Sequence, residues 1–303
     1  MAECEATITY FHQSGFSVGC GGTLLVFDYW RGERNEVKGS LALSEADFAG
    51  YSQVLFFVSH EHLDHFDRVI YDFSHLNFVH YIIAADMPAD AQGDRMGVGD
   101  VRVYGGVKVT AYASTDLGVS FYVEAGGLRI FHAGDLNLWH WREESTLRQI
   151  TQAENLYYEA VKPLIGKPID ICMFPVDPRM GGMYEAGANH FIMTCKPHVF
   201  IPMHWQGRSE IANDFARRCR TKYTEGVALT KPRERAVITF NNNSINIHVY
   251  LSAEQEDMLK RRQRSTESED MVQQALRALE KGDPFAESDL PVDSITQQKD
   301  QQE

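Results

Sequence analysis

The chain of 303 residues contains few cysteines, an odd number of them, and no pair spaced as CxxC. The cysteines are Cys4, Cys20, Cys172, Cys195 and Cys219. This pattern argues against a disulfide framework and against a dithiol redox motif. We therefore expect reduced thiols in a cytoplasmic protein, with Cys172 and Cys195 as small residues of the core because they lie in apolar segments.

Positive charge is also scarce, and long apolar runs are missing. There are 29 Lys and Arg residues against 42 Asp and Glu, which gives a net charge of -13. Nucleic-acid-binding surfaces are usually basic, so no nucleic-acid partner is expected. No apolar run approaches the ~18 residues that span a bilayer, and the acidic start does not resemble a signal peptide. These absences favour a small-molecule partner and no membrane, and they are compatible with a homo-oligomer.

What the chain does contain is typical of a globular fold, with 44% hydrophobic residues and short strand patterns. Glycines 21 and 22 predict a hairpin turn before residues 23–27. Strand patterns dominate the first half, and strands alternate with helices from about residue 143 onward. This order predicts an α+β fold, in which two packed sheets are covered by helices in a four-layer α/β/β/α sandwich. Strands are expected at residues 6–10, 23–27, 54–58, 107–113, 119–124, 128–131, 169–174 and 199–202, and helices at 143–162, 187–195 and 210–221.

The composition changes near residue 253, where the chain becomes acidic and poor in apolar residues. Residues 270–281 could form one amphipathic helix, and the residues after it have the composition of a disordered segment. We therefore predict a domain at residues 1–252, followed by an acidic helix and tail at residues 253–303.

The strongest chemical signal directly follows the apolar stretch at residues 54–58. Three imidazoles and two carboxylates fall within six positions, in the run His60-Glu61-His62-Leu63-Asp64-His65. Imidazole is the commonest metal ligand in proteins, and open α/β sheets build their sites at the carboxyl ends of strands. One divalent ion could bind His60 and His62, and a second could bind Asp64 and His65, if the chain turns there into a helix that begins near Asp64. Zn²⁺ takes about four ligands, so other segments must contribute.

Two later segments repeat the pattern of an apolar run followed by a donor. Residues 128–131 lead to His132 and then to Gly134 and Asp135, and residues 199–202 lead to His204. We expect Asp135 to bridge the two ions and His204 to complete the second site. Gly134 would allow a close backbone approach or an unusual dihedral angle.

These pieces together resemble the metallo-β-lactamase superfamily. The resemblance rests on His60-x-His62-x-Asp64-His65, on Gly134-Asp135 and on the strand that ends at His204. The segments Phe11-His12-Gln13-Ser14-Gly15-Phe16 and Ile201-Pro202-Met203-His204 are similar to the branch of ascorbate-6-phosphate lactonase. The superfamily implies two sheets flanked by helices, a centre of one or two metals, and mostly hydrolytic chemistry on lactams, lactones, thioesters and phosphodiesters.

The sequence departs from that family at one ligand. A further histidine usually lies between the first motif and the bridging aspartate, but Ser114 occupies the matching position here. The first site could then hold only His60, His62 and Asp135, with Asp116 as a candidate replacement ligand. Alternatively, a single ion binds Asp64, His65, Asp135 and His204.

Other residues are candidates for substrate binding or for orienting the ligands. Asp177 and Arg179 follow a predicted strand, and Arg179 could bind an anionic group because guanidinium pairs with carboxylate and phosphate. His12 and His140 are candidates for the pocket, as are the tryptophans near Asp135.

The sequence thus predicts a metal-dependent hydrolase that uses activated water on a small, anionic or neutral ester, lactone or phosphodiester. Asp64 and Asp135 are its expected catalytic residues, and one or two divalent ions (Zn, Mn or Fe) are its cofactor. Two alternatives stay open. One is a metal-binding or regulatory protein with impaired catalysis. The other is a redox di-iron protein, which the absence of a flavodoxin-like domain disfavours.

Overall fold

The computed structural model describes residues 4–141, 143–241 and 244–250. The strands are β1 (Cys4–His12), β2 (Gly15–Cys20), β3 (Thr23–Phe27), β4 (Gln53–Val58), β5 (Val79–Ala84), β6 (Asp94–Met96), β7 (Val101–Tyr104), β8 (Val107–Ala113), β9 (Val119–Ala125), β10 (Leu128–His132), β11 (Ile171–Pro175), β12 (Val199–Met203), β13 (Glu225–Gly226), β14 (Arg235–Phe240) and β15 (Ile245–Tyr250). The α-helices are α1 (Leu147–Val161), α2 (Ala186–Cys195) and α3 (Ser209–Arg218). The 3₁₀ helices are η1 (Gly39–Leu41), η2 (Glu45–Phe48), η3 (Arg68–Phe73), η4 (Lys162–Leu164) and η5 (Pro178–Met183). The predicted C-terminal helix and tail, residues 253–303, lie outside the described residues.

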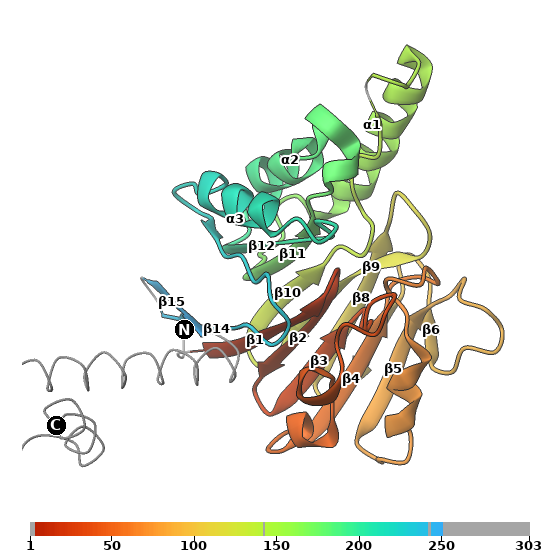
Figure 1. Ribbon diagram of the computed structural model, residues 1–303, viewed down its shortest axis with the longest axis vertical. Helices are drawn as coiled ribbons and strands as arrows, with labels where there is room; N and C mark the ends of the chain where they lie inside the picture. Colours follow the sequence, from red (N-terminus) through yellow and green to blue (C-terminus); the bar gives the residue numbers. More distant parts are fainter. Residues whose placement is uncertain (1–3, 142, 242–243, 251–303) are drawn as a thin grey trace, which may run out of the picture. The chain divides into compact units, whose positions relative to one another are not determined.

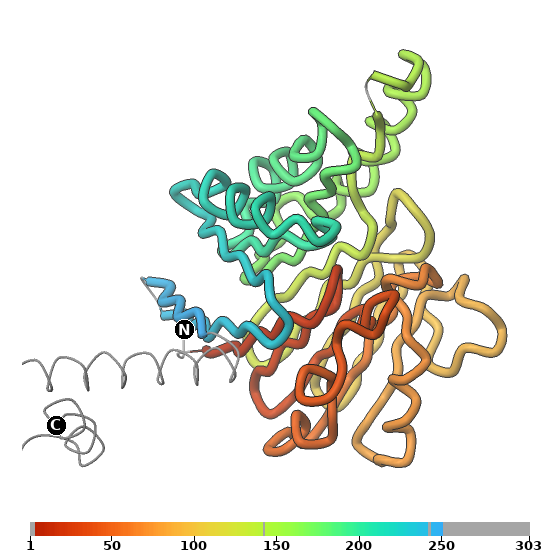
Figure 2. The backbone as a smooth tube through the Cα atoms, viewed as in Figure 1, coloured from red at the N-terminus to blue at the C-terminus, as the bar shows by residue number. Residues whose placement is uncertain are grey.

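Within the described residues, the strands form two mixed sheets (Figure 1). One has the order β15-β14-β1-β2-β3-β4-β5-β6, and the other has the order β13-β12-β11-β10-β9-β8-β7. The predicted hairpin is confirmed, because β2 and β3 pair antiparallel around Gly21 and Gly22, whose φ angles are 54° and 80°. The colours of Figure 2 show that the first sheet comes largely from the start of the chain, while the α-helices cover the second sheet.

Aromatic side chains define the order of the layers. On β4, Phe56 contacts Phe48 of η2 and Phe73 of η3, whereas the next residue, Phe57, contacts Phe121 of the other sheet. Successive strand residues point to opposite faces, so one face of β4 meets the 3₁₀ helices and the other meets the second sheet. On the far side of the second sheet, Phe131 stacks on Phe191 of α2. The predicted α+β four-layer sandwich is therefore confirmed, but the layer outside the first sheet contains 3₁₀ helices.

Two predicted helix starts differ from the observed ones. The helix expected from residue 143 begins at Leu147, because Thr146 and Gln149 form a capping box that satisfies the first backbone N–H groups. No helix begins near Asp64. The chain instead makes a turn in which the backbone N–H groups of His65 and Phe66 donate to the carbonyl of His62, and helical structure resumes only in η3.

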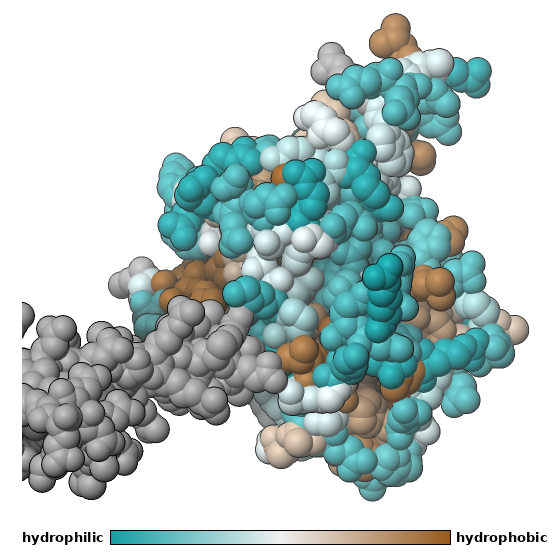
Figure 3. Space-filling model, viewed as in Figure 1, coloured by the Kyte–Doolittle hydropathy of each residue, from teal (hydrophilic) through white to brown (hydrophobic). Residues whose placement is uncertain are grey.

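Two surface features complete the description. At the edge of the first sheet, Ile245, Ile247 and Val249 of β15 line a groove with α3, and Figure 3 shows apolar side chains gathered there.

Among the described residues, no helix combines the length and the apolar character that crossing a membrane requires.

Candidate metal centre

The predicted metal ligands follow strands that run in the same direction within each sheet. His60, His62, Asp64 and His65 lie on the loop after β4, which is parallel to β3. Asp135 follows β10 and His204 follows β12, and these two strands flank the parallel strand β11. The carboxyl ends of parallel strands meet at one edge of a sheet, so the packing of the two sheets brings the donors together.

The first group of donors consists of His60, His62, Asp116 and Asp135, whose ligating atoms all lie within 4.8 Å of one another. His60 Nε2 lies 2.9 Å from His62 Nδ1 and 3.7 Å from Asp135 Oδ2, and His62 Nδ1 lies 3.8 Å from Asp116 Oδ2. The His62 and Asp116 side chains are 45% and 39% exposed. This group therefore has one buried side and one side open to solvent.

The second group consists of Asp64, His65 and His204, again with ligating atoms within 4.8 Å. His204 Nε2 lies 3.1 Å from Asp64 Oδ2, and His65 Nε2 lies 3.9 Å from the same oxygen. Both imidazoles are buried and Asp64 is partly exposed. This group is therefore more enclosed than the first.

Asp135 lies between the two groups and turns one oxygen toward each. Its Oδ1 is 3.1 Å from His65 Nε2 and 3.6 Å from His204 Nε2, whereas its Oδ2 faces His60. Asp135 Oδ1 and His65 Nε2 are buried, and despite their separation of 3.1 Å neither forms an aligned hydrogen bond with the other or with another described residue. Buried polar atoms without a partner cost free energy, and a cation between them would satisfy both. The residues present therefore fit a divalent ion in the second group, with Asp135 shared between the groups.

A buried carboxylate that sequence analysis missed supports both groups. Asp28, directly after β3, accepts hydrogen bonds from the backbone N–H of Ser59 (2.8 Å) and from the Ser59 hydroxyl (2.6 Å). Its Oδ2 also lies 2.7 Å from His65 Nδ1, and the Ser59 hydroxyl lies 2.9 Å from His60 Nδ1. Outer carboxylates of this kind fix the tautomer and orientation of a ligating imidazole. Asp28 adopts a positive φ of 41°, an uncommon conformation for a residue other than glycine.

Asp177 has the same relation to His204. Its Oδ2 lies 2.9 Å from His204 Nδ1, and both of its oxygens accept hydrogen bonds from Arg179. The Asp177 side chain is fully buried. Asp177 thus contacts both His204 and Arg179.

Two glycines allow the backbone to approach the loop after β4. Gly134 has a φ of 53°, and a Cβ there would lie 2.8 Å from that of Ser59. A Cβ on Gly118 would lie 1.8 Å from the carbonyl oxygen of Ser59. Both positions require glycine for close approach, as expected for Gly134.

The charges of the centre favour a bound cation. Burial and the neighbouring His65 lower the pKa of His60 to about 4, so its imidazole is neutral and can ligate. Burial raises the pKa of Asp135, but the attraction of His204 and His65 outweighs it and holds the pKa well below its usual range. Burial lowers the pKa of His204, yet Asp135 and Asp177 raise it to about 9. Without an ion, the carboxylates around His204 thus favour its protonated, positively charged form, and a bound metal would supply that positive charge instead.

A pocket of about 370 Å³ opens onto the donors. Trp139 donates its indole N–H to the Asp135 carbonyl (2.7 Å), Trp141 donates to the Arg179 carbonyl (3.0 Å), and the two rings stack with centroids 6.4 Å apart. The pocket is lined by His62, Asp64, Thr115, Asp116, Asp135, Trp139, Trp141, Arg179 and His204.

The two histidines predicted for the pocket are not among its lining residues. His12 packs edge-on against Trp30, with ring centroids 4.9 Å apart. His140 is buried, and its ring nitrogens have no hydrogen-bond partner among the described residues. The Ser114 hydroxyl accepts a hydrogen bond from the backbone N–H of Asp116 at 3.3 Å.

No protein-family model matches the sequence, and no curated protein matches it. Solved structures do match the fold. The match to Igni18, a metallo hydrolase from the archaeon Ignicoccus hospitalis, covers 78% of this chain and 99% of the Igni18 chain, with a TM-score of 0.56 and 18% sequence identity. A protein from Parabacteroides distasonis described as a metal-dependent hydrolase covers 74% and 93%, with a TM-score of 0.52 and 15% identity. A variant of CmlA, the diiron β-hydroxylase of Streptomyces venezuelae, covers 78% and 54%, with a TM-score of 0.51 and 11% identity. The chain therefore shares the α+β sandwich fold of these metal-dependent proteins, as its resemblance to the metallo-β-lactamase superfamily predicted.

Proposed function

We propose that this protein is a metal-dependent hydrolase that holds two divalent ions in the two donor groups. The observation that carries the proposal is the position of Asp135, whose two oxygens face different groups while Oδ1 and His65 Nε2 lack a partner among the described residues. A carboxylate with this geometry suits a bridge between two metals. His60, His62 and Asp116 would complete the first site, and Asp64, His65 and His204 would complete the second.

The chain's own residues divide the work around that centre. A bound divalent ion supplies an activated water at neutral pH, since it lowers the pKa of water to roughly 7, and polarises the attacked group. Asp64 is partly exposed and lines the pocket beside Asp135, so it can orient the nucleophile and accept its proton. Asp28 and Asp177 hold the Nδ1 atoms of His65 and His204, which leaves the Nε2 atoms free to ligate.

The pocket suits a small ester, lactone or phosphodiester. Its volume of about 370 Å³ lies within the range of small-molecule sites. A lactone is included because of the sequence resemblance to ascorbate-6-phosphate lactonase. Within the described residues, the buried thiols of Cys20, Cys172, Cys195 and Cys219 form no disulfide, which is consistent with a cytoplasmic location.

Metal analysis combined with a substrate panel tests this function. Protein purified without chelator should carry two divalent ions per chain and should hydrolyse at least one lactone, ester or phosphodiester after loading with Zn²⁺ or Mn²⁺. Asp135→Ala should lose both the metal and the activity. Asp170→Asn, which changes a buried aspartate outside the two groups, should keep both.

Two outcomes contradict the proposal. An Asp135→Ala variant with full metal and full turnover would contradict the assignment of the centre. A protein with full metal that hydrolyses no member of the panel would favour a metal-binding or regulatory protein.

The carboxylate of Asp116 in the first group favours a second candidate function, that of a di-iron oxidative enzyme. Asp116 lies near His62 and follows Ser114, which occupies the position of the family histidine, by two residues. Sites rich in His and Asp suit iron. Loading with Fe²⁺ under anaerobic conditions and then adding oxygen separates the candidates. Oxygen uptake that depends on substrate, without hydrolysis by the Zn²⁺ form, would favour oxidation.

The ligand role of Asp116 has its own test in metal stoichiometry. Asp116→Ala should reduce two ions per chain to one, because the second group does not contain this residue. Two tightly held ions in Asp116→Ala would exclude it as a ligand.

A further inference from the structure

Arg179 lies at the border between two pockets beside the candidate metal centre. It lines the pocket of about 370 Å³ that opens onto the donors and is the only Lys or Arg among the described residues that line it. It also lines a neighbouring pocket of about 830 Å³, together with Asp64. A group bound to Arg179 would therefore lie next to the proposed catalytic centre.

The guanidinium of Arg179 uses only one of its edges. Nε donates to Asp177 at 2.9 and 3.0 Å, and Nη2 donates to Asp177 Oδ2 at 2.5 Å. The fork has five N–H donors, and among the described residues none accepts a hydrogen bond from Nη1. The Arg179 side chain is 55% exposed although Asp177 is fully buried, so the edge formed by Nη1 and Nη2 is accessible to a ligand.

The position of Arg179 is fixed from two sides. Asp177 accepts from its backbone N–H at 2.8 Å as well as from its side chain, and the Trp141 indole donates to its carbonyl. A guanidinium that is already held in place loses less conformational entropy when it binds a ligand. The adjoining stacked rings of Trp139 and Trp141 offer an apolar wall on the path from Asp135 to Arg179.

We propose that Arg179 is the specificity residue for a substrate that carries a carboxylate and a flat apolar part, and this rests on the proposed hydrolase function. The open Nη1/Nη2 edge binds the carboxylate with two parallel hydrogen bonds. The apolar part lies against Trp139 and Trp141.

Equilibrium binding of two matched probes tests this proposal without any turnover. Isothermal titration calorimetry on the Zn²⁺-loaded protein compares 3-phenylpropanoate with the neutral 3-phenylpropanamide. The wild type should bind the carboxylate at least about tenfold more tightly, as expected for a charge-assisted bidentate pair. Arg179→Gln should bind the two probes equally, and Arg179→Lys should keep only part of the preference because an ammonium cannot form the planar fork.

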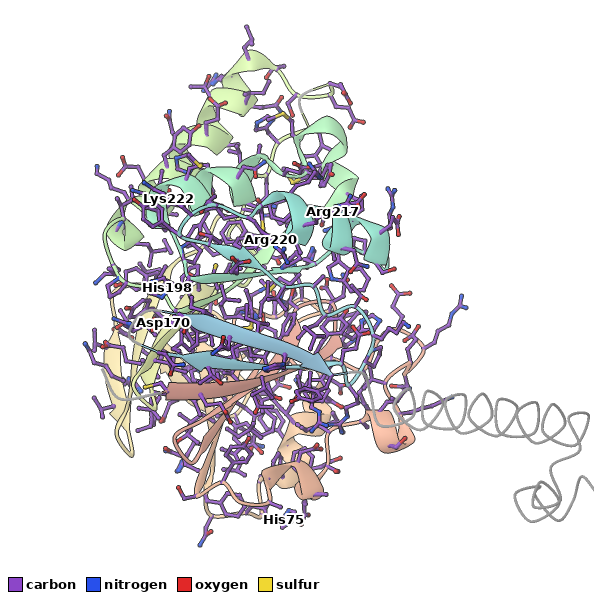
Figure 4. All side chains as sticks on the ribbon, turned by 90° about the vertical axis from the view of Figure 1, so that its left-hand side faces the viewer. His75, Asp170, His198, Arg217, Arg220 and Lys222 are labelled. Carbon is purple, nitrogen blue, oxygen red and sulfur yellow. The ribbon has the colours of Figure 1, made fainter. Side chains whose placement is uncertain are left out.

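A control variant and a metal measurement separate recognition from structural damage. Arg217→Gln changes an exposed arginine on α3, shown in Figure 4, and should bind both probes like the wild type. The zinc content of each variant is measured, because Asp177 contacts both Arg179 and His204. If Arg179→Gln loses zinc, the comparison is made with Arg179→Lys, which leaves a cation beside Asp177.

Steady-state kinetics provide a second measurement. Monophenyl glutarate and phenyl pentanoate differ by a carboxylate in place of a methyl group. Arg179→Gln should raise the KM of the first ester about tenfold or more relative to the KM of the second ester, measured with the same zinc-loaded variant.

Three results overturn the proposal: equal binding or no binding of both probes by the wild type, a carboxylate preference that persists in the zinc-loaded Arg179→Gln variant, or an equal loss of both probes in that variant. Persistence would show that the metal centre itself binds the anion. If no ester is hydrolysed, the hydrolase function fails, while the binding comparison still decides the role of Arg179.

Discussion

The Asp28→Asn variant should weaken metal binding although Asp28 belongs to neither group of proposed ligands. The carboxylate accepts hydrogen bonds from the Ser59 backbone N–H on Oδ1, and on Oδ2 it contacts both the Ser59 hydroxyl and His65 Nδ1. An asparagine amide has a similar shape but only one accepting oxygen. One of the two buried N–H groups that Asp28 accepts from must therefore lose its acceptor.

Either orientation of the amide disturbs the centre. If the amide nitrogen faces the Ser59 backbone N–H, two donors oppose each other. If it faces His65 Nδ1, that atom must accept, so the ring proton moves to Nε2, which lies 3.1 Å from Asp135 Oδ1. A protonated Nε2 cannot ligate a metal, so the variant loses either backbone stability or the tautomer that metal binding needs.

The magnitudes follow from these contacts. One buried N–H group without an acceptor costs about 1–3 kcal/mol of stability. Loss of an outer carboxylate that orients a ligating histidine typically reduces metal affinity by roughly 10- to 100-fold, or about 1.4–2.7 kcal/mol of binding free energy.

Chelator competition with Zn²⁺ measures the affinity, and urea unfolding in the presence of chelator measures the stability. Asp170→Asn is the matched control, because Asp170 is also buried and pairs with Arg129 at 2.6 Å and with His198 at 3.1 Å. Asp170 and His198, labelled in Figure 4, directly precede β11 and β12, whereas Asp177 and His204 come after these strands. Asp170→Asn should lose stability and keep its zinc affinity. Unchanged zinc affinity in Asp28→Asn would refute the reasoning.

Three further predictions concern the loops and charges of the centre. Ser114→His should raise the metal occupancy of the first group after dialysis, measured by elemental analysis, and an unchanged occupancy would contradict the position assigned to the missing histidine. Backbone strain at a positive φ costs about 1–3 kcal/mol. Gly118→Ala should destabilise the fold by more than this strain alone, because its Cβ would also clash with Ser59. Gly166→Ala, which shares a positive φ but has nothing within 4 Å of its Cβ, gives the strain alone in the same urea unfolding assay. In metal-free protein, protonated His204 stabilises the fold because its pKa is raised from 6.5 to about 9. This stabilisation is complete below pH 6.5 and is lost as the pH rises through about 9. Added Zn²⁺ should abolish this loss, and metal-free protein that is equally stable at pH 6.5 and pH 9 would count against it.

The sequence predicted those parts of the centre that local patterns encode. His60, His62, Asp64 and His65 were found because they form one run after a buried strand, and Asp135 and His204 because each follows an apolar segment. Asp116 was found only through the family pattern, as the nearest donor to the missing histidine. Its position within 4.8 Å of the other donors depends on the turn between β8 and β9.

The parts that sequence analysis missed depend on long-range pairing. Asp28 is an isolated aspartate after a strand, and its role requires β3 to lie parallel to β4, where the Asp28 N–H donates to the carbonyl of Phe57. The strands β14 and β15 were also missed. The strand β15 does alternate, since Ile245, Ile247 and Val249 are separated by Asn246 and His248, so this strand was within reach of the sequence pattern.

The way the centre is anchored argues that the fold exists before the metal binds. Apart from Asp116, its donors and their carboxylate supports follow β3, β4, β10, β11 and β12, whose pairing and apolar residues lie in the core. Small zinc domains lack such a core and fold only when metal binds. Here an ion should instead add stability by mass action, about 2.7 kcal/mol when the free metal is roughly 100 times its dissociation constant. Chelated protein should therefore keep its near-UV circular dichroism and melt at a lower temperature, whereas loss of that signal on chelation would mean that the ion builds the sandwich.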